Sequence, residues 1–214
     1  MFALVCSAAR SAVVLVLMSA IGLVGSSDVG FAKAQAGGEV VFAQKLVAAA
    51  REQRTVPVIY DPSYRQLEYP MGDVPWYVGV CTDVVIRAYR KLGIDLQPLV
   101  HRSRLGSGDR NIDHRRVRVL KKYFSRYGTS LKVSKDPGNY MPGDLVTYYV
   151  PDGTFSKTHI AIVSDKQTLA GVPFVIHNRG YGVREEDWLF GSEITGHYRF
   201  KRAPNIEGWS SKAK

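Results

Sequence analysis

The sequence predicts an α+β domain, in which helices come first along the chain and antiparallel strands follow. Up to Gly128, apolar residues recur three or four positions apart, as they do on one face of a helix. After Pro142-Gly143-Asp144 they stand in short runs rich in β-branched and aromatic residues, separated by turn residues. Because the two patterns occupy separate parts of the chain, we expect helices packed on one antiparallel sheet.

Three segments carry the helical pattern: residues 39–54, 82–92 and 115–127. Gly93 and Gly128 follow the last two, and glycine is common just after the end of a helix. Residues 55–71 contain several prolines and are expected to be extended. Residues 101–114 are polar and rich in glycine, which predicts a long loop.

Four segments carry the strand pattern: residues 145–150, 159–164, 173–178 and 195–200. We expect them to form a small antiparallel sheet. The sequence shows no internal repeat and no low-complexity segment, so a single domain with one core is predicted.

The composition is that of a globular protein with a basic surplus. Hydrophobic residues make up 45% of the 214 residues and charged residues 22%, which excludes disordered, collagen-like and disulfide-dense chains. Lysine and arginine number 29 against 19 aspartates and glutamates, so the net charge is +10. Such a charge favours polyanionic partners, namely nucleic acid, acidic lipid or a bacterial envelope polymer.

The N-terminus resembles a secretory signal peptide, predicted to cover residues 1–36. Arg10 supplies a positive charge, and an apolar run over residues 12–24 follows it. Small residues then allow cleavage after Ala34 or Ala36, which leaves residues 37–214 as the mature domain. The apolar run is shorter than the ~20 residues that a membrane-spanning helix needs.

Export would determine the compartment and the partners. We expect a periplasmic or secreted protein that is not inserted in the membrane after cleavage, binds no nucleic acid and is a monomer. Cys6 precedes the apolar run instead of following it, which argues against a lipoprotein. Cys6 would leave with the signal, so Cys81 would be the mature protein's single cysteine. A lone thiol in an oxidising compartment is paired between molecules, buried and inert, or chemically active.

Cys81 stands at the predicted start of a helix, a position that bears on its reactivity. Unpaired N–H groups and the helix dipole favour an anion there, so the thiol is expected to ionise more readily than a free one. Asp83 in the same turn opposes this ionisation if its carboxylate faces the sulfur. Its other role would be to cap the N–H groups of the helix.

Two of the five histidines outside the signal stand at the ends of predicted strands. His159 opens one strand and His177 closes another, so neighbouring antiparallel strands would bring both to one face. One could then accept the thiol proton while the other orients it, as in a catalytic triad. The alternative is that both are buried structural residues, which is the role expected for His101 and His197.

The order of short motifs resembles that of the NlpC-type branch of papain-like cysteine peptidases, which cleave peptide bonds in bacterial cell walls. The matching segments span roughly residues 60–180: Tyr69-Pro70-Met71-Gly72, Gly79-Val80-Cys81-Thr82-Asp83, Leu92-Gly93-Ile94-Asp95-Leu96, Pro142-Gly143-Asp144-Leu145, His159-Ile160-Ala161-Ile162 and Val175-Ile176-His177-Asn178. Each is weak alone, and their common order carries the resemblance.

A closer resemblance is to a bacterial family known as domain of unknown function 1287. Its hallmarks are Gly79-Val80-Cys81-Thr82-Asp83-Val84-Val85-Ile86-Arg87, Asn111-Ile112-Asp113-His114-Arg115-Arg116 and Ile194-Thr195-Gly196-His197-Tyr198. This family covers most of the mature chain but indicates no substrate, and it leaves the role of Asn111 and its neighbours unassigned.

The resemblance implies a papain-like fold and roles for individual residues. Cys81 would be the nucleophile, His159 the general base and His177 the residue that orients this base. Tyr69 would border the oxyanion site. Thr82-Asp83 replaces the usual Ser-Gly, so Asp83 would either select a cationic substrate group or only cap the helix. The candidates for binding the substrate or its oxyanion are Tyr69, Asp83, Asp113, His114 and Asn178.

The predicted function is therefore an exported cysteine hydrolase that cleaves an amide bond, with peptidoglycan stem peptides as the expected substrate. Arg115, Arg116 and Arg118 are expected to hold an anionic envelope polymer, and Asp83 and Asp113 a substrate amine. No ligand spacing indicates a metal, and no cofactor is expected. The alternatives are an acyl- or peptidyl-transferase with the same triad and a non-catalytic protein that binds the cell wall.

Overall fold

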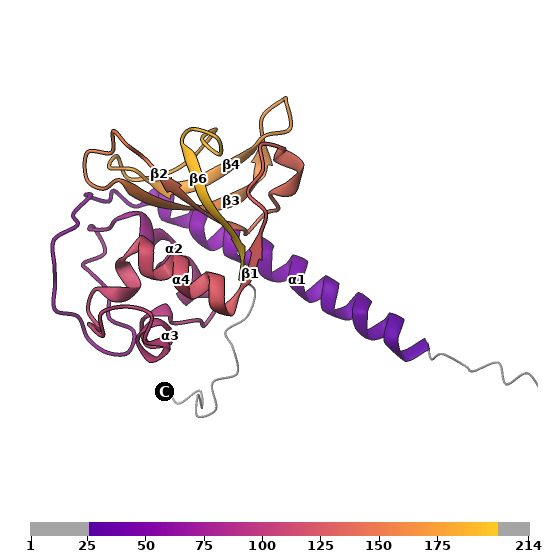
Figure 1. Ribbon diagram of the computed structural model, residues 1–214, viewed down its shortest axis with the longest axis horizontal. Helices are drawn as coiled ribbons and strands as arrows, with labels where there is room; N and C mark the ends of the chain where they lie inside the picture. The colour runs from indigo at the N-terminus through magenta and orange to yellow at the C-terminus, as the bar shows by residue number, and fades with distance from the viewer. Residues whose placement is uncertain (1–25, 201–214) are drawn as a thin grey trace, which may run out of the picture.

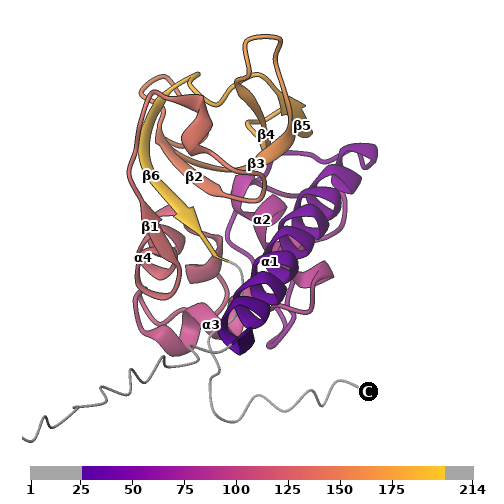
Figure 2. The same cartoon turned by 90° about the vertical axis from the view of Figure 1, so that its right-hand side faces the viewer.

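The computed structural model describes residues 26–200, and the side chains of residues 37–200. The helices lie on one side of a six-stranded antiparallel sheet, which forms the second layer (Figure 1). Seen from the side, the first helix runs diagonally across the helical layer, under the strands (Figure 2). The predicted α+β class is confirmed.

Four α-helices form the first layer: α1 (Ser26–Glu52), α2 (Cys81–Lys91), α3 (Leu96–Ser103) and α4 (Val117–Tyr127). Single turns of 3-10 helix cover Gln53–Thr55, Asp113–Arg115 and Pro137–Asn139. α2 and α4 lie within two residues of their predicted bounds.

Helix α3 was not predicted, and its last residues lie in the segment that was expected to be a loop. Asp95 caps it by accepting a hydrogen bond from the backbone N–H of Gln97 at 3.1 Å. Pro98 stands in the first turn, where a missing N–H breaks no helical hydrogen bond. At eight residues, the helix is too short for a clear apolar periodicity.

Helix α1 begins earlier than the predicted helix and runs through both predicted cleavage positions. Residues 1–25 of the predicted signal lie outside the described residues, so the signal and its removal remain predictions. Within residues 26–200, no helix is both long and apolar enough to cross a membrane.

The sheet has the strand order β1-β6-β2-β3-β4-β5. Its strands are β1 (Thr129–Leu131), β2 (Leu145–Tyr149), β3 (Thr158–Gln167), β4 (Pro173–Asn178), β5 (Val183–Glu186) and β6 (Glu193–Arg199). Every neighbouring pair is antiparallel. The four predicted strands are present. β1 and β5 were missed because they are short and mostly polar.

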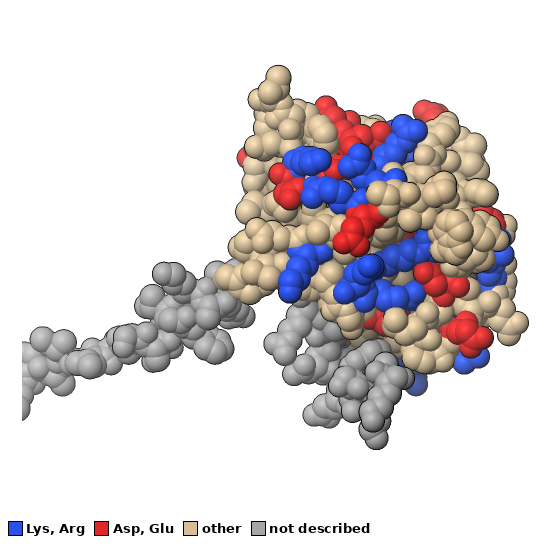
Figure 3. Space-filling model, turned by 180° about the vertical axis from the view of Figure 1, so that it is seen from behind, with Lys and Arg blue, Asp and Glu red and all other residues tan. Residues whose placement is uncertain are grey.

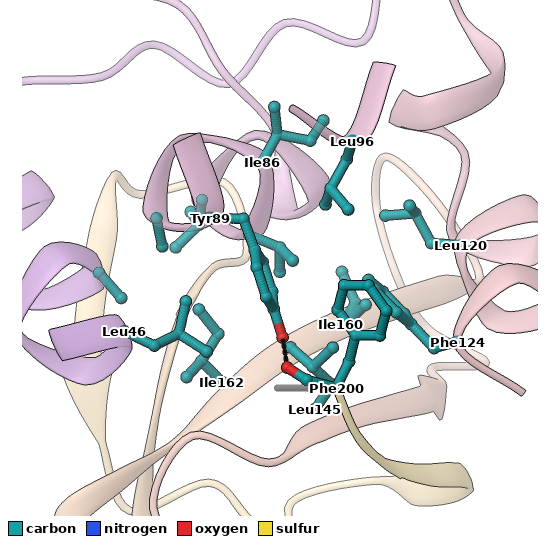
Figure 4. Packing of buried hydrophobic residues seen from close by; sticks show 14 of the residues in the cluster. Leu46, Ile86, Tyr89, Leu96, Leu120, Phe124, Leu145, Ile160, Ile162 and Phe200 are labelled. Carbon is teal, nitrogen blue, oxygen red and sulfur yellow. Dashed lines mark hydrogen bonds between the residues drawn. The ribbon is translucent and has the colours of Figure 1, made fainter. Parts of the chain in front are cut away.

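The main core lies between the helices and the sheet. Tyr89 of α2 stands at its centre, among Phe124 and Phe200, and its hydroxyl donates to the Phe200 carbonyl at 2.8 Å (Figure 4). On β3, Ile160 faces this core whereas Ala161 faces a second cluster on the outer side of the sheet. This packing holds the first turn of α2 against the start of β3.

Candidate active site

Cys81 is the first residue of α2 and is only 3% exposed. The chain that leads to it is held by a parallel bridge between Ile59 and Val78. Ile59 donates to the Tyr77 carbonyl at 2.7 Å, and Gly79 donates to the Ile59 carbonyl at 3.0 Å. These bonds deliver the thiol to the helix start, as the sequence predicted.

A cleft of about 500 Å³ opens at Cys81, where α2, the start of α4 and two loops meet. Its wall includes the rings of Tyr60 and Phe155, which stack with their centroids 4.5 Å apart. Tyr64 and three arginines, Arg115, Arg116 and Arg118, complete much of the lining. A larger hollow of about 790 Å³ lies beside Trp76 and Arg87, but Cys81 does not line it.

The two histidines at the strand ends meet, as the alternation of β3 and β4 predicted. The Nε2 atom of His159 lies 2.9 Å from Nδ1 of His177. On the far side of His177, Nε2 lies 2.9 Å from Oε1 of Glu186, which comes from β5. Trp188 covers both histidine rings. The result is a chain of three hydrogen-bonded side chains, in which the two histidines are buried and Glu186 is 28% exposed.

Glu186 determines where the protons of this chain sit. Its hydrogen bond from His177 and its contact with Arg179 lower the pKa of Glu186 to about 2, so its carboxylate can only accept. His177 therefore carries its proton on Nε2 and accepts at Nδ1 from Nε2–H of His159. The lone pair of His159 is thus on Nδ1, which has no hydrogen-bond partner within the described chain.

Cys81 lies close to the backbone of β3 next to His159. The thiol lies beside the backbone N–H of Ile160, the residue that follows His159. The His159 ring, however, lies with Tyr148 and Trp188, which belong to the cluster on the outer side of the sheet. Over residues 37–200, no hydrogen bond joins this ring to the thiol. In enzymes without substrate, such a catalytic bond is often long.

The resting site is neutral, which corrects the expectation of a readily ionised thiol. The pKa of Cys81 is raised to about 11, chiefly by burial and in addition by the nearby carboxylate of Asp83. Hydrogen bonds from the Ile160 N–H and the Tyr60 hydroxyl offset only part of this. Burial also lowers the pKa of His159 well below its usual value. Desolvation therefore outweighs the helix dipole here.

Asp83 has a structural role, and its carboxylate is not free for the substrate amine that was expected there. Its two oxygens accept from Nε and Nη2 of Arg115, both at 2.8 Å. One of them also accepts from the backbone N–H of Val80 at 2.7 Å, so the helix-cap role is confirmed. Both side chains are 3% exposed, so Arg115 is not the surface charge that was expected.

Tyr60, and not Tyr69, is the tyrosine beside the thiol. The Tyr69 ring instead contacts His101, with centroids 5.6 Å apart, and lies under Arg110. The spacing between Tyr69 and Cys81 was misleading because residues 57–80 form a long loop, in which distance along the chain does not indicate distance in space. The Ile59–Val78 bridge brings the chain past the thiol nine residues before Tyr69.

Three further candidates are buried away from the cleft lining, which corrects their predicted role in binding. Asp113 holds a loop by accepting from the Ser107 hydroxyl and the Gly108 N–H, each at 2.8 Å. His114 is 2% exposed. Asn178 donates to the Gly79 carbonyl at 3.3 Å and so ties β4 to the chain before Cys81.

Asn111, which the sequence left without a role, supports the cleft wall. Its side-chain oxygen accepts from the Leu67 N–H at 2.9 Å, and its amide donates to the Tyr64 hydroxyl at 2.9 Å. His197 is structural, as expected, since its ring bonds to Asp144 at 2.8 Å. Over the residues with described side chains, no three histidine, cysteine or acidic residues gather as a metal ion would require.

Sequence reasoning missed Tyr60 and Glu186. A signal for Glu186 exists, because His177 pairs with Arg184 across a hairpin. The diagonal neighbour two residues further is Glu186, within reach of a histidine ring. Tyr60 had no such signal, because its position depends on the course of a loop.

The fold and the cleft define an α+β protein with a cysteine at a helix start beside a hydrogen-bonded histidine pair. The chain belongs to the family described as domain of unknown function 1287, which it matches over residues 47–200. It is 45% identical over 163 residues to the uncharacterized protein YijF of Escherichia coli strain K12. That match covers 71% of this chain and 78% of YijF.

Solved structures with a similar course of the chain carry NlpC names. NlpC2 from Trichomonas vaginalis is 16% identical with a TM-score of 0.46, over 75% of this chain and 47% of that one. An NlpC/P60 family protein from Bacillus cereus is 15% identical with a TM-score of 0.43, over 75% of this chain and 40% of that one. This chain thus spans less than half the length of either, and their activities are not carried over to it.

Proposed function

We propose that the protein is an exported cysteine hydrolase that cleaves an amide bond, with peptidoglycan stem peptides as its substrate in the periplasm or outside the cell. One observation carries the proposal. A cleft opens at Cys81, the only cysteine of residues 37–200. The backbone beside its thiol belongs to β3, the strand that carries His159, and His159 in turn pairs with His177.

The reaction would begin with transfer of the thiol proton of Cys81 to Nδ1 of His159. Sγ then attacks the carbonyl carbon of the amide, and the negative charge moves to the carbonyl oxygen. The imidazolium returns the proton to the amine as the C–N bond breaks, leaving a thioester on Cys81. Water, deprotonated by His159, then cleaves the thioester, which releases the acid and restores the thiol.

Glu186 supports the charged form of His159 in this scheme. Its negative charge raises the pKa of His159 against the effect of burial. The same carboxylate accepts from His177, which keeps the His159 ring in the tautomer that has a free Nδ1. These are the roles of the aspartate in a serine protease triad, exerted through one intervening histidine.

Tyr60 supports the thiol side of the reaction. Its hydroxyl lies beside the thiol and the backbone N–H of Cys81, close enough to influence the pKa of the thiol. A backbone N–H at a helix start is the type of donor that stabilises a carbonyl oxyanion. The hydroxyl would move from this N–H to the oxyanion when a substrate enters, and both groups would then donate to it.

The rival from another class is a non-catalytic protein that binds an anionic envelope polymer. The neutral thiol, with no hydrogen bond to His159 within the described chain, favours this rival. The charge distribution on the surface argues against this rival. On the face shown in Figure 3, basic side chains lie among acidic ones, so the surplus charge forms no continuous basic surface there. A transferase would share the first half of the reaction and differ only in using an amine in place of water.

The test is digestion of purified sacculi and of soluble muropeptides by the mature protein, followed by mass spectrometry. We expect new fragments with wild type and none with Cys81→Ala or His159→Ala. His101→Gln is the matched control, because this histidine lies beside Tyr69 outside the cleft lining. Products that carry a joined amine would assign a transferase. Identical profiles for wild type and Cys81→Ala, with both bound to sacculi, would establish the binding protein.

A further inference from the structure

The cleft at Cys81 carries an uncompensated positive charge. Its lining contains Arg115, Arg116 and Arg118 and no aspartate or glutamate among the described residues. Arg115 is neutralised by Asp83, with which it forms a two-armed ion pair. The other two arginines are the ones that remain available to a ligand.

Arg116 and Arg118 have weak partners or none in the described chain. The guanidinium of Arg116 lies 4.0 Å from the carboxylate of Asp113, at the limit of an ion pair, and its side chain is 37% exposed. That carboxylate already accepts from Ser107 and Gly108. Arg118 is exposed and has no ion-pair partner over residues 37–200. Both guanidinium groups can therefore bind a new anion without breaking a strong contact.

The backbone at this side of the cleft adds to the same charge. Helix α4 begins at Val117, which also lines the cleft. No side chain caps this helix, and its first turn contains no acidic residue. The positive end of its dipole thus lies on the same wall as the two arginines and is not offset by a carboxylate there.

We infer that the cleft binds a substrate carboxylate close to the scissile amide, through Arg116 and Arg118. This inference rests on the proposed function. It replaces the substrate amine expected at Asp83 and Asp113 with a carboxylate, and it narrows the anionic polymer expected at Arg116 and Arg118 to an acid group beside the scissile bond. The carboxylates of Asp83 and Asp113 were expected to hold an amine, but both are occupied by contacts within the protein. The substrate class is an acyl donor with a free acid group near the amide, and its amidated analogue should be a poorer substrate.

Two alkylating reagents test the charge of the cleft without requiring hydrolysis. The thiolate of Cys81 forms a C–S bond to the methylene carbon of either iodoacetate or iodoacetamide and displaces iodide into solution. The two reagents are similar in shape and differ in carrying a carboxylate or a neutral amide. We measure the rate constant of iodoacetate divided by that of iodoacetamide at pH 9. We expect this ratio at Cys81 to exceed the same ratio for free cysteine about three- to fivefold. This range corresponds to roughly 0.7 to 1 kcal/mol, the upper range for an exposed ion pair.

Variants assign the effect to the two arginines. The double variant Arg116→Gln/Arg118→Gln should bring the ratio to that of free cysteine, and 0.5 M salt should reduce it in wild type. Arg126→Gln is the matched control, because Arg126 stands in the last turn of α4 and lies over the Tyr127 ring. A wild-type ratio at or below that of free cysteine, or a ratio that the double variant leaves unchanged, would overturn the inference.

A matched pair of muropeptides, with a free or an amidated carboxylate beside the scissile bond, separates this inference from the proposed function. Faster cleavage of the free acid, lost in the double variant, supports both. Equal cleavage of the two would overturn the inference and leave the hydrolase intact. Cleavage of neither, together with a raised alkylation ratio, would refute the hydrolase on these substrates and keep the anion-binding cleft.

Discussion

The buried pair of Asp83 and Arg115 gives the sharpest prediction for stability. Asp83→Asn keeps an oxygen that can accept from the Val80 N–H, but it leaves the Arg115 charge buried without a counterion. Both side chains are 3% exposed, and both carboxylate oxygens lie 2.8 Å from guanidinium nitrogens. Removing one partner of such a buried pair costs about 3 to 5 kcal/mol of unfolding free energy.

A second substitution should restore most of this loss. In Asp83→Asn/Arg115→Met no charge remains to be buried, and replacement of a buried pair by neutral groups is often close to neutral. We expect the double variant to lie within about 2 kcal/mol of wild type in urea unfolding followed by circular dichroism. The two single losses would therefore be far from additive.

The same variants separate the structural role of Asp83 from a role in binding. A folded double variant should keep a KM close to that of wild type, because the Asp83 and Arg115 side chains bind each other and are not available to a substrate. A loss below about 1 kcal/mol in Asp83→Asn would refute the reasoning on the buried pair. An intact fold with a KM raised selectively for substrates that carry an amine would return Asp83 to the binding site.

Three further predictions concern proton equilibria. Since burial lowers the pKa of His114 to about 4, the unfolded chain binds this proton first on acidification, and stability is lost as the pH falls from 6.5 towards 4. Urea unfolding at pH 7 and 5 should show a loss of about 2 kcal/mol from this group alone, and a flat profile would contradict it. Since burial raises the pKa of Cys81 to about 11, iodoacetamide should label it slowly at pH 7, with about 100-fold less thiolate than an unperturbed thiol, and the rate should still rise above pH 9. Labelling as fast as that of free cysteine at pH 7 would contradict this neutral resting thiol. Glu186→Gln should reduce kcat about tenfold or more and shift the pH profile of kcat, since the His159 imidazolium loses its support; an unchanged profile would make Glu186 merely structural.

Much of the fold could be predicted from the sequence, because periodicity is a local property. The alternation of apolar residues in β3 and β4 was enough to bring His159 and His177 to one face of the sheet. The helical pattern begins at residue 82, and this placed Cys81 at the start of α2. α3 and β5 escaped because short elements contain too few residues for a period to show.

The partners of polar residues could not be predicted, because they depend on the path of the chain. Asp83 finds Arg115, which is 32 residues away, and Tyr60 reaches the thiol through a bridge that no local pattern indicates. The protonation state of the Cys81 thiol could not be predicted either. It follows from burial, which depends on how Tyr60 and β3 close over Cys81.

The central claim is that Cys81 attacks an amide carbonyl and becomes acylated. It is tested most directly by mixing the mature protein with muropeptides, quenching in acid and recording the intact mass. We expect a transient adduct with the mass of the acyl half of the substrate, located on Cys81 by peptide mapping and absent from Cys81→Ala. The adduct should also be absent from His159→Ala, since no other group accepts the thiol proton. Fragments released without an adduct, at equal rates in wild type and Cys81→Ala, would contradict the claim.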